Sequence, residues 1–206
     1  MKKINCIALF LTWVLLSRCG SNIKELPDLA VTDSLLNSKE WVQIKLKPES
    51  FCIPVKWQPL NQKFYYYFSY LNNKDENRYF VIAKYDMRKT SVTPLRYLHE
   101  TYSEALKDTA ELFNGYTLKR LNINKNEVYY SEFYTNIRNT KYLTYSMIFT
   151  NKGFLYDVSM KGWLNESLRL KNDYTNILSS LVIGNTNIFK KSFPISKIEV
   201  VDLSKI

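Results

Sequence analysis

Four consecutive strand-like segments between residues 116 and 161 constrain the fold of this 206-residue chain most. They cover roughly 116–123, 127–136, 141–150 and 153–161, and short asparagine-rich turns separate them. The third and fourth segments alternate apolar with polar residues, as at Leu143, Tyr145, Met147 and Phe149. Alternate side chains of a strand point to opposite faces of a sheet. We therefore expect an antiparallel meander with one buried and one wetter face.

Two stretches with helical spacing flank the meander. Residues 94–114 carry an apolar stripe, opened by Thr93-Pro94 and closed by Asn114-Gly115, which are typical of a helix start and stop. The stripe consists of Leu95, Leu98, Tyr102, Ala105, Leu106, Thr109, Leu112 and Phe113. A second helix is predicted from about Leu168 to Val182, with Gly184 as its stop.

Further strands are predicted ahead of the first helix. Residues 41–46 alternate in part, and 64–71 with 78–85 are predicted to form a hairpin around a polar turn. Residues 79–83 are apolar on both faces, which predicts a strand covered on both sides. The expected fold class is α+β: one domain, residues 41–184, with an antiparallel sheet flanked by helices. Residues 185–206 are expected to be a tail or an added edge strand.

The N-terminus has the pattern of an export signal. Two lysines precede an apolar run from Ile4 to Leu16, which is shorter than the ~20 residues that a membrane-spanning helix needs. Leu16-Ser17-Arg18-Cys19 resembles a lipobox, with Arg18 in place of the usual small residue. We expect a signal peptide at 1–18, lipid on Cys19 and a tether at 19–40. The alternative is a plain signal peptide, or an uncleaved anchor in which Cys19 is incidental.

Cysteine usage agrees with this processing. Cleavage removes Cys6 and acylation occupies Cys19, so Cys52 alone remains and no disulfide forms within the mature domain. Flanked by Phe51 and Ile53, Cys52 is expected to be a small buried hydrophobic residue.

The chain is basic, with a formal net charge of +10 that falls by three when the signal peptide leaves. A basic surface suits nucleic acid or anionic lipid headgroups. The lysines are scattered along the sequence, so the net charge alone does not decide between them. Export argues against nucleic acid. Gly20 follows Cys19 where an aspartate would favour the inner membrane, so an outer membrane is preferred.

The element order resembles that of the PsbP-like superfamily. Members open with a segment of the type F-x-I-x-x-P-x-x-W, which Phe51, Ile53, Pro54 and Trp57 match with closer spacing. Members also place a strand–Gly–strand hairpin before the last helix, as residues 151–160 and the segment to Leu181 do. The resemblance spans roughly residues 41–184. It implies an α-β-α sandwich and a scaffold or binding role, and it carries no catalytic residues to transfer.

No catalytic or metal-binding pattern emerges from the sequence. His99 is the only histidine, and no nucleophile accompanies it at a recognisable spacing. One histidine and one free cysteine do not make a zinc site, and no glycine-rich phosphate loop is present. Carboxylate pairs drawn from Glu127, Glu132, Asp157 and Glu166 would occur in any strand-rich protein. We expect neither cofactor nor metal.

Tyrosines are the most distinctive residues of the chain. An exposed aromatic surface would suit a protein partner or a glycan, whereas core packing explains many of the same rings. Glu132 interrupts the apolar alternation of its segment, and so is expected either to be buried with a basic partner or to line a groove. The candidate binding residues are Tyr65, Tyr67, Tyr130, Glu132 and Tyr134.

These observations favour a membrane-anchored envelope protein that binds an envelope protein partner without catalysis. The alternative is a carrier with a pocket for a small or lipidic ligand between sheet and helices. A hydrolase comes third, and convergence of His99, Glu132 and Asp157 would favour it.

Overall fold

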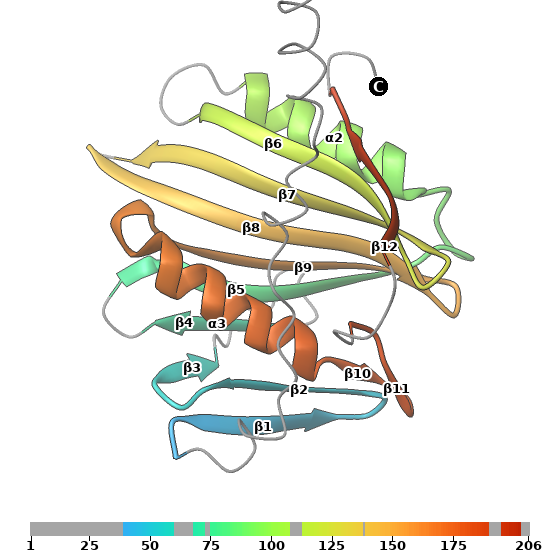
Figure 1. Ribbon diagram of the computed structural model, residues 1–206, viewed down its shortest axis with the longest axis horizontal. Helices are drawn as coiled ribbons and strands as arrows, with labels where there is room; N and C mark the ends of the chain where they lie inside the picture. Colours follow the sequence, from blue (N-terminus) through green and yellow to red (C-terminus); the bar gives the residue numbers. More distant parts are fainter. Residues whose placement is uncertain are drawn as a thin grey trace, which may run out of the picture.

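The computed structural model describes residues 39–59, 68–72, 75–107, 113–137, 139–189 and 195–202 (Figure 1). Its strands and helices follow one another in the order β1 (Trp41–Leu46), β2 (Glu49–Pro54), β3 (Trp57–Pro59), β4 (Phe68–Asn72), β5 (Asp75–Asp86), α2 (Pro94–Lys107), β6 (Phe113–Ile123), β7 (Asn126–Ile137), β8 (Thr140–Asn151), β9 (Phe154–Trp163), η3 (Leu164–Glu166), α3 (Ser167–Ser180), β10 (Val182–Ile183), β11 (Thr186–Asn187) and β12 (Ile195–Val200).

The main sheet has eight strands in the order β12-β6-β7-β8-β9-β5-β4-β3, and neighbouring strands run antiparallel. The predicted meander is its centre, β6 to β9. Two-residue turns join β6 to β7 and β8 to β9, with positive φ at Asn124 (50°) and Lys125 (65°) and at Lys152 (49°) and Gly153 (81°). Such turns match the right-handed twist of the strands they connect. A smaller sheet has the order β1-β2-β10-β11.

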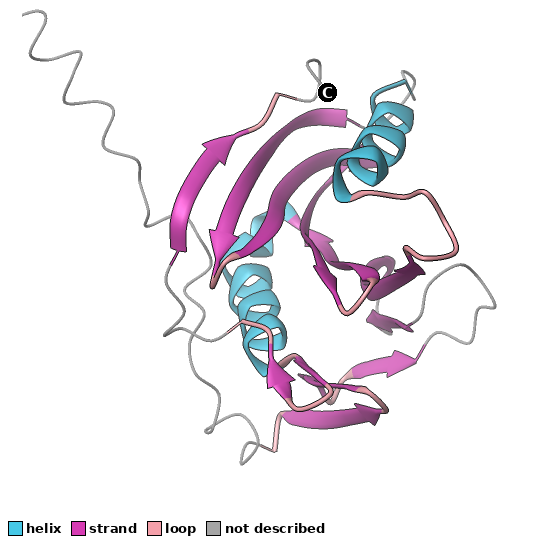
Figure 2. Cartoon of the chain, turned by 90° about the vertical axis from the view of Figure 1, so that its right-hand side faces the viewer, coloured by secondary structure: helices cyan, strands magenta, loops and turns pink. Residues whose placement is uncertain are grey.

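The two helices lie on opposite faces of the main sheet (Figure 2). On one face α3 packs against β9, β8 and β2, and Leu170, Tyr174, Ile177 and Leu178 enter the larger core. On the other face Leu98 of α2 packs with Leu118, Tyr129, Phe133, Ile148 and Leu155. The expected α+β sandwich is therefore present, and β5 is covered on both sides, with Phe80, Val81, Ile82 and Ala83 all buried.

The structure corrects the predicted extent of both helices. Thr93 caps the first helix as expected, because its hydroxyl accepts a hydrogen bond from the Arg96 backbone N–H at 3.2 Å. The helix is assigned only to Lys107, however, and Phe113 already pairs with Thr135 in the sheet. Leu95 was predicted to be buried and is 40% exposed. The second helix ends at Ser180, because Val182 pairs with Ser50 of β2.

The expected wetter face of the meander is wholly or partly exposed only toward its ends, as at Thr144, Thr150 and Lys161. Ser146, Asp157 and Ser159 are all buried, because α2 covers their face and their polar groups bond to one another. Residues 185–206 were expected to be either a tail or an added edge strand. The structure shows an edge strand, β12, which pairs with β6. The expected signal peptide and Cys19 lie outside the described residues. Across the part of the chain that is described, no helix has both the length and the apolarity to cross a membrane.

Candidate functional site

Glu132 of β7 is held by two tyrosine hydroxyls from its own strand. The Tyr130 hydroxyl donates to Glu132 Oε1 at 2.6 Å, and the Tyr134 hydroxyl donates to Oε2 at 3.1 Å. These side chains lie two residues apart in a strand and therefore share a face. Tyr130 is fully buried, whereas Glu132 and Tyr134 are partly exposed. The result is a carboxylate fixed in position at the boundary between core and solvent.

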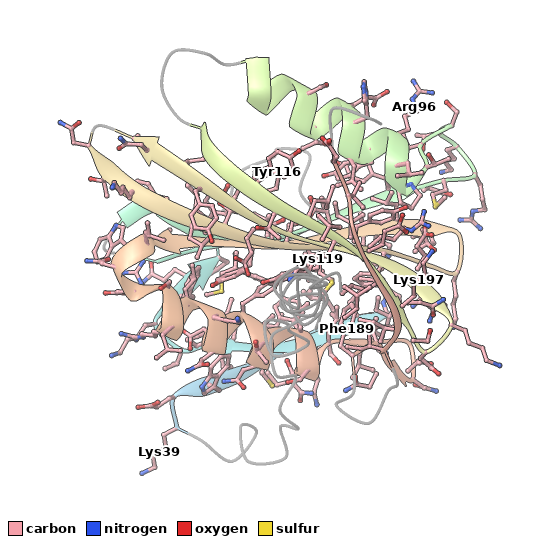
Figure 3. All side chains as sticks on the ribbon, turned by 45° about the horizontal axis from the view of Figure 1, so that its top comes forward. Lys39, Arg96, Tyr116, Lys119, Phe189 and Lys197 are labelled. Carbon is pink, nitrogen blue, oxygen red and sulfur yellow. The ribbon has the colours of Figure 1, made fainter. Side chains whose placement is uncertain are left out.

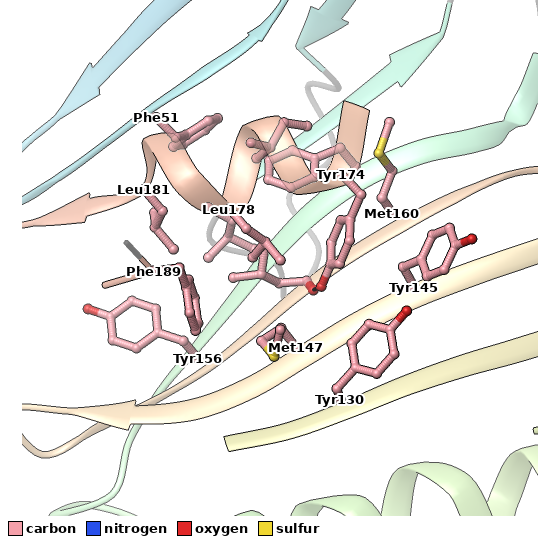
Figure 4. Close-up of a cluster of buried hydrophobic side chains, with 14 of the residues drawn as sticks. Phe51, Tyr130, Tyr145, Met147, Tyr156, Met160, Tyr174, Leu178, Leu181 and Phe189 are labelled. Carbon is pink, nitrogen blue, oxygen red and sulfur yellow. Dashed lines mark hydrogen bonds between the residues drawn. The ribbon is translucent and has the colours of Figure 1, made fainter. Parts of the chain in front are cut away.

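A stack of tyrosine rings connects this carboxylate to α3. The rings of Tyr130 and Tyr145 are 6.4 Å apart, and those of Tyr145 and Tyr174 are 5.6 Å apart (Figure 4). The Tyr174 hydroxyl donates to the Val158 carbonyl at 2.7 Å. Burial, and then the charge of Glu132, raises the pKa of both Tyr130 and Tyr145. Both phenols therefore stay protonated and able to donate.

The sheet around Glu132 extends beyond the strands that α3 covers. The main strand contacts of α3 are with β2, β8 and β9, whereas Glu132 lies on β7 opposite Thr117 of β6. Thr117 and Lys119 are partly exposed, and Figure 3 labels Tyr116 and Lys119 along the same strand. A fixed carboxylate beside tyrosine hydroxyls can accept a charge-assisted hydrogen bond from a lysine or arginine of another molecule. We call Glu132, Tyr134 and Thr117 the Glu132 surface.

Three of the five predicted binding residues come together here: Tyr130, Glu132 and Tyr134. Tyr65, Tyr67 and the predicted lipidation site Cys19 lie outside the described residues. Tyr130 contributes its hydroxyl and not an exposed ring. Sequence reasoning missed Tyr145 and Tyr174. Tyr145 lies directly opposite Glu132 in the register of β7 and β8. The alternation of these two strands could have predicted that pairing. Tyr174 comes from a distant helix and left no local signal.

A second polar cluster lies on the opposite face of the sheet, beneath α2. Asp157 accepts hydrogen bonds from the hydroxyls of Ser159, Ser146 and Tyr97 at 2.6, 2.7 and 2.9 Å. Burial raises the pKa of Asp157, and the three hydroxyl donors oppose that shift. The cluster satisfies its own buried polar groups and is closed off from solvent, as expected of a structural network.

The three residues whose convergence would favour a hydrolase do not meet. Glu132 faces the α3 side of the sheet, Asp157 faces the α2 side, and His99 is exposed on α2. Cys52 is buried as predicted, and burial raises the pKa of its thiol. Among the described residues no group of three or more His, Cys, Asp or Glu side chains could hold a metal ion.

Two pockets lie at opposite ends of the main sheet. One, of about 100 Å³, lies among the β6–β7 turn, the β8–β9 turn and β11. The other is an open hollow of about 600 Å³ beside Trp163, between the start of β8 and η3. The space between α3 and the sheet is instead filled by side chains of the larger core.

Comparison with known structures identifies a protein with a similar fold. Cyanobacterial PsbP (CyanoP) from Synechocystis superposes with a TM-score of 0.52 at 12% sequence identity, over 72% of this chain and 95% of that one. The chain has a PsbP-like fold. The resemblance drawn from element order and from the segment between Phe51 and Trp57 is thereby confirmed for the fold.

Weaker likenesses link the PsbP-like chain to two further proteins. LpqN, involved in cell envelope biogenesis of Mycobacterium tuberculosis, is 11% identical over 75% of this chain and 98% of its own, with a TM-score of 0.45. A Bacteroides thetaiotaomicron protein is 14% identical over 66% of this chain and 45% of its own, with a TM-score of 0.42. No family model and no curated protein matches the sequence. The likenesses concern the fold alone.

Proposed function

We propose that this chain is a lipid-anchored protein of the cell envelope whose PsbP-like domain binds a protein partner without catalysis. The observation that carries the proposal is Glu132, a partly exposed carboxylate held by two tyrosine hydroxyls on a part of the sheet beyond α3. Because the Glu132 side chain is fixed before binding, it loses little conformational entropy when a partner docks. The expected contact is a lysine or arginine of the partner.

The anchor in this proposal is lipid on Cys19, supported by the signal-like N-terminus and by Leu16 and Ser17 before the cysteine. The structure of the domain supports a protein-binding function better than a ligand-carrier function. A carrier of a lipidic ligand needs an apolar chamber, and the space between α3 and the sheet holds packed rings such as Tyr145, Tyr174 and Phe149.

The proposal is tested by purifying the full chain from detergent-solubilised membranes of its own host. Wild type is compared with Glu132→Gln, which keeps a hydrogen-bond acceptor and removes the charge. The matched control is Glu127→Gln, an exposed glutamate on the same strand whose carboxylate bonds to Tyr129. We expect one stoichiometric partner with wild type and with the control. With Glu132→Gln we expect the affinity for that partner to fall at least about tenfold, which corresponds to the free energy of one charge-assisted hydrogen bond.

Intact mass measurement of the same samples tests the anchor. Wild type is expected to begin at Cys19 and to carry acyl chains, whereas Cys19→Ser is expected to lack them. A wild-type chain without lipid overturns the anchor. A partner retained equally by all variants, or absent from all of them, overturns the role of Glu132. Equal thermal stability of the two glutamine variants shows that any difference in binding is not a folding defect.

A further inference from the structure

Five cationic side chains lie on turns at the same end of the two sheets. They are Lys47 between β1 and β2, Arg88 and Lys89 after β5, Lys125 between β6 and β7, and Lys152 between β8 and β9. All five are exposed. This end lies at the right of Figure 1 and faces the viewer in Figure 2. We call these five residues the basic rim.

Backbone and side-chain contacts join several turns of the basic rim. The Met87 backbone N–H donates to the Gly153 carbonyl at 3.0 Å, which brings the turn of Arg88 to that of Lys152. A Cβ on Gly184 would lie 3.5 Å from Lys152 Nζ, and the Gly184 N–H donates to the Pro48 carbonyl at 2.7 Å, beside Lys47. The cations therefore share one surface.

The carboxylates beside the basic rim already have partners, as Glu127, two residues after Lys125, has in Tyr129 and Arg120. Asp86 binds Arg88 through two hydrogen bonds of 2.9 Å and lies near Lys89, and these contacts hold the pKa of Asp86 below its usual value. Glu49 is buried and bonded to Lys84. Within the described residues, Lys47, Lys125 and Lys152 take part in no ion pair.

The pocket of about 100 Å³ opens between the turns that carry Lys125 and Lys152. Rings of Phe149 and Phe189 form part of its wall, and its polar lining includes Asn124, Asn126, Asn151 and Thr186. The carboxamides of the three asparagines make no hydrogen bond among the described residues, so their N–H groups are available. The volume equals about three water molecules at ~30 Å³ each, which is room for one phosphate group.

Lys125 and Lys152 each occupy a central position of a two-residue hairpin turn. Lys125 and Lys152 have φ of 65° and 49°, in the left-handed region that favours glycine or asparagine. Both turns that border the pocket therefore carry an exposed lysine.

We propose that this pocket binds the phosphate of an anionic phospholipid headgroup and that the basic rim docks this end of the domain onto the membrane. Carboxamide N–H groups and ammonium groups are donors suited to a phosphodiester. Lys47, Arg88 and Lys89 extend the basic rim beyond the pocket. A membrane surface with many anionic headgroups can therefore contact more of these cations than one free phosphate can. The inference concerns a face other than the Glu132 surface and does not rest on the protein partner.

The test is lysine acetylation of the full chain reconstituted into vesicles, read by mass spectrometry at each lysine. Phosphatidylcholine vesicles are compared with an equal mixture of phosphatidylcholine and phosphatidylglycerol, so the anchoring of the chain is the same in both. Lys47, Lys89, Lys125 and Lys152 are expected to react roughly fivefold more slowly on the anionic vesicles. Lys56 and Lys141, exposed at the other end of the molecule, are expected to react equally on both.

The controls are well separated from the basic rim. Lys141 pairs with Asn136 at the end of β7 away from Lys125, and Lys56 follows Pro54 at the end of β2 away from Lys47. The double variant Lys125→Gln/Lys152→Gln is expected to abolish the protection of Lys47 and Lys89. The charge-matched Lys56→Gln/Lys141→Gln is expected to keep it.

Three outcomes overturn the proposal. Equal labelling of the basic rim on both vesicles shows no docking. Uniform slowing of every lysine, Lys56 and Lys141 included, shows a general effect of surface potential. Protection by inorganic phosphate alone, on phosphatidylcholine vesicles, assigns the pocket to a soluble phosphate in place of a lipid.

Discussion

At the scale of single residues, Asp157 shows how this protein places an acid inside its core. Three hydroxyl groups donate to its carboxylate, and α2 closes the site from above. Burial raises its pKa above the unfolded value of about 3.9. The folded state therefore favours the protonated acid. The contribution of this group to stability is fully present below the unfolded pKa and is lost as the pH rises through the folded pKa.

Asp157→Asn removes the titration and keeps a side chain of the same shape. We expect the unfolding free energy of wild type to fall relative to the variant as the pH rises above the unfolded pKa of about 3.9, because burial raises the folded pKa of Asp157. Urea unfolding of both proteins across this range measures the difference. Asp157→Ala is the contrast: it leaves three buried hydroxyls without their acceptor and is expected to cost about 2 kcal/mol or more at every pH. A wild type that gains stability over Asp157→Asn with rising pH would contradict the raised pKa.

At the scale of elements, the contact between β9 and α3 depends on the missing side chain of Gly162. A Cβ at this position would lie 2.7 Å from Leu170 Cδ1, and Leu170 is only 3% exposed. Gly162→Ala therefore pushes the helix from the sheet and is expected to destabilise the protein by about 1–3 kcal/mol. Leu170→Ala alone opens a cavity at a cost of about 2–5 kcal/mol.

The double variant separates crowding from other effects. Gly162→Ala/Leu170→Ala is expected to cost less than the sum of its parts, because the new methyl group occupies the space that Leu170 leaves. Leu178→Ala, in the same helix, serves as the control and is expected to add its full cost to Gly162→Ala. Chemical denaturation of the five variants measures these differences. Additive costs for Gly162 and Leu170 would sink the steric explanation.

Strands were predictable from the sequence wherever apolar and polar residues alternate. The alternation at Leu143, Tyr145 and Met147 located β8, and turn residues located its neighbours. The end of the first helix was not predictable, because Leu112 and Phe113 continue its apolar spacing while Phe113 belongs to β6. Burial of Ser146 and Ser159 was missed because their small polar side chains indicate solvent until the carboxylate that they bond is known.

The Glu132 surface was predictable to a similar extent. An acid within the apolar alternation of β7 marked the position, since a carboxylate there needs partners. Tyr130 and Tyr134 followed from a period of two. Tertiary contacts could not be predicted from the sequence. These include whether α3 would cover β7 and which tyrosine of another element would stack on Tyr130. The pocket beside Lys125 and Lys152 likewise depends on turns that are adjacent only after the meander folds.

At the scale of the whole molecule, the two sheets are joined by a buried ion pair. Glu49 opens β2 of the smaller sheet, and its side chain is fully buried. Lys84 of β5 donates to Glu49 Oε1 at 2.6 Å, and the Tyr156 hydroxyl of β9 donates to the same oxygen at 2.7 Å. Lys84 also lies 4.5 Å from the centre of the Phe154 ring. One carboxylate thus links two strands of the main sheet to the smaller one.

Removing that carboxylate alone is expected to loosen the smaller sheet first. Glu49→Gln leaves the ammonium group of Lys84 largely buried without its counter-charge and is expected to cost about 3 kcal/mol. Replacing both partners, as in Glu49→Gln/Lys84→Met, is expected to recover most of that loss, because no buried charge remains. Glu100→Gln, which breaks an exposed pair with Arg96, is the control and is expected to cost less than about 1 kcal/mol. Urea unfolding gives the free energies, and hydrogen exchange shows whether β1 and β2 open before the meander. A cost for Glu49→Gln as small as that of Glu100→Gln would mean that α3 and the core hold the two sheets together without this pair.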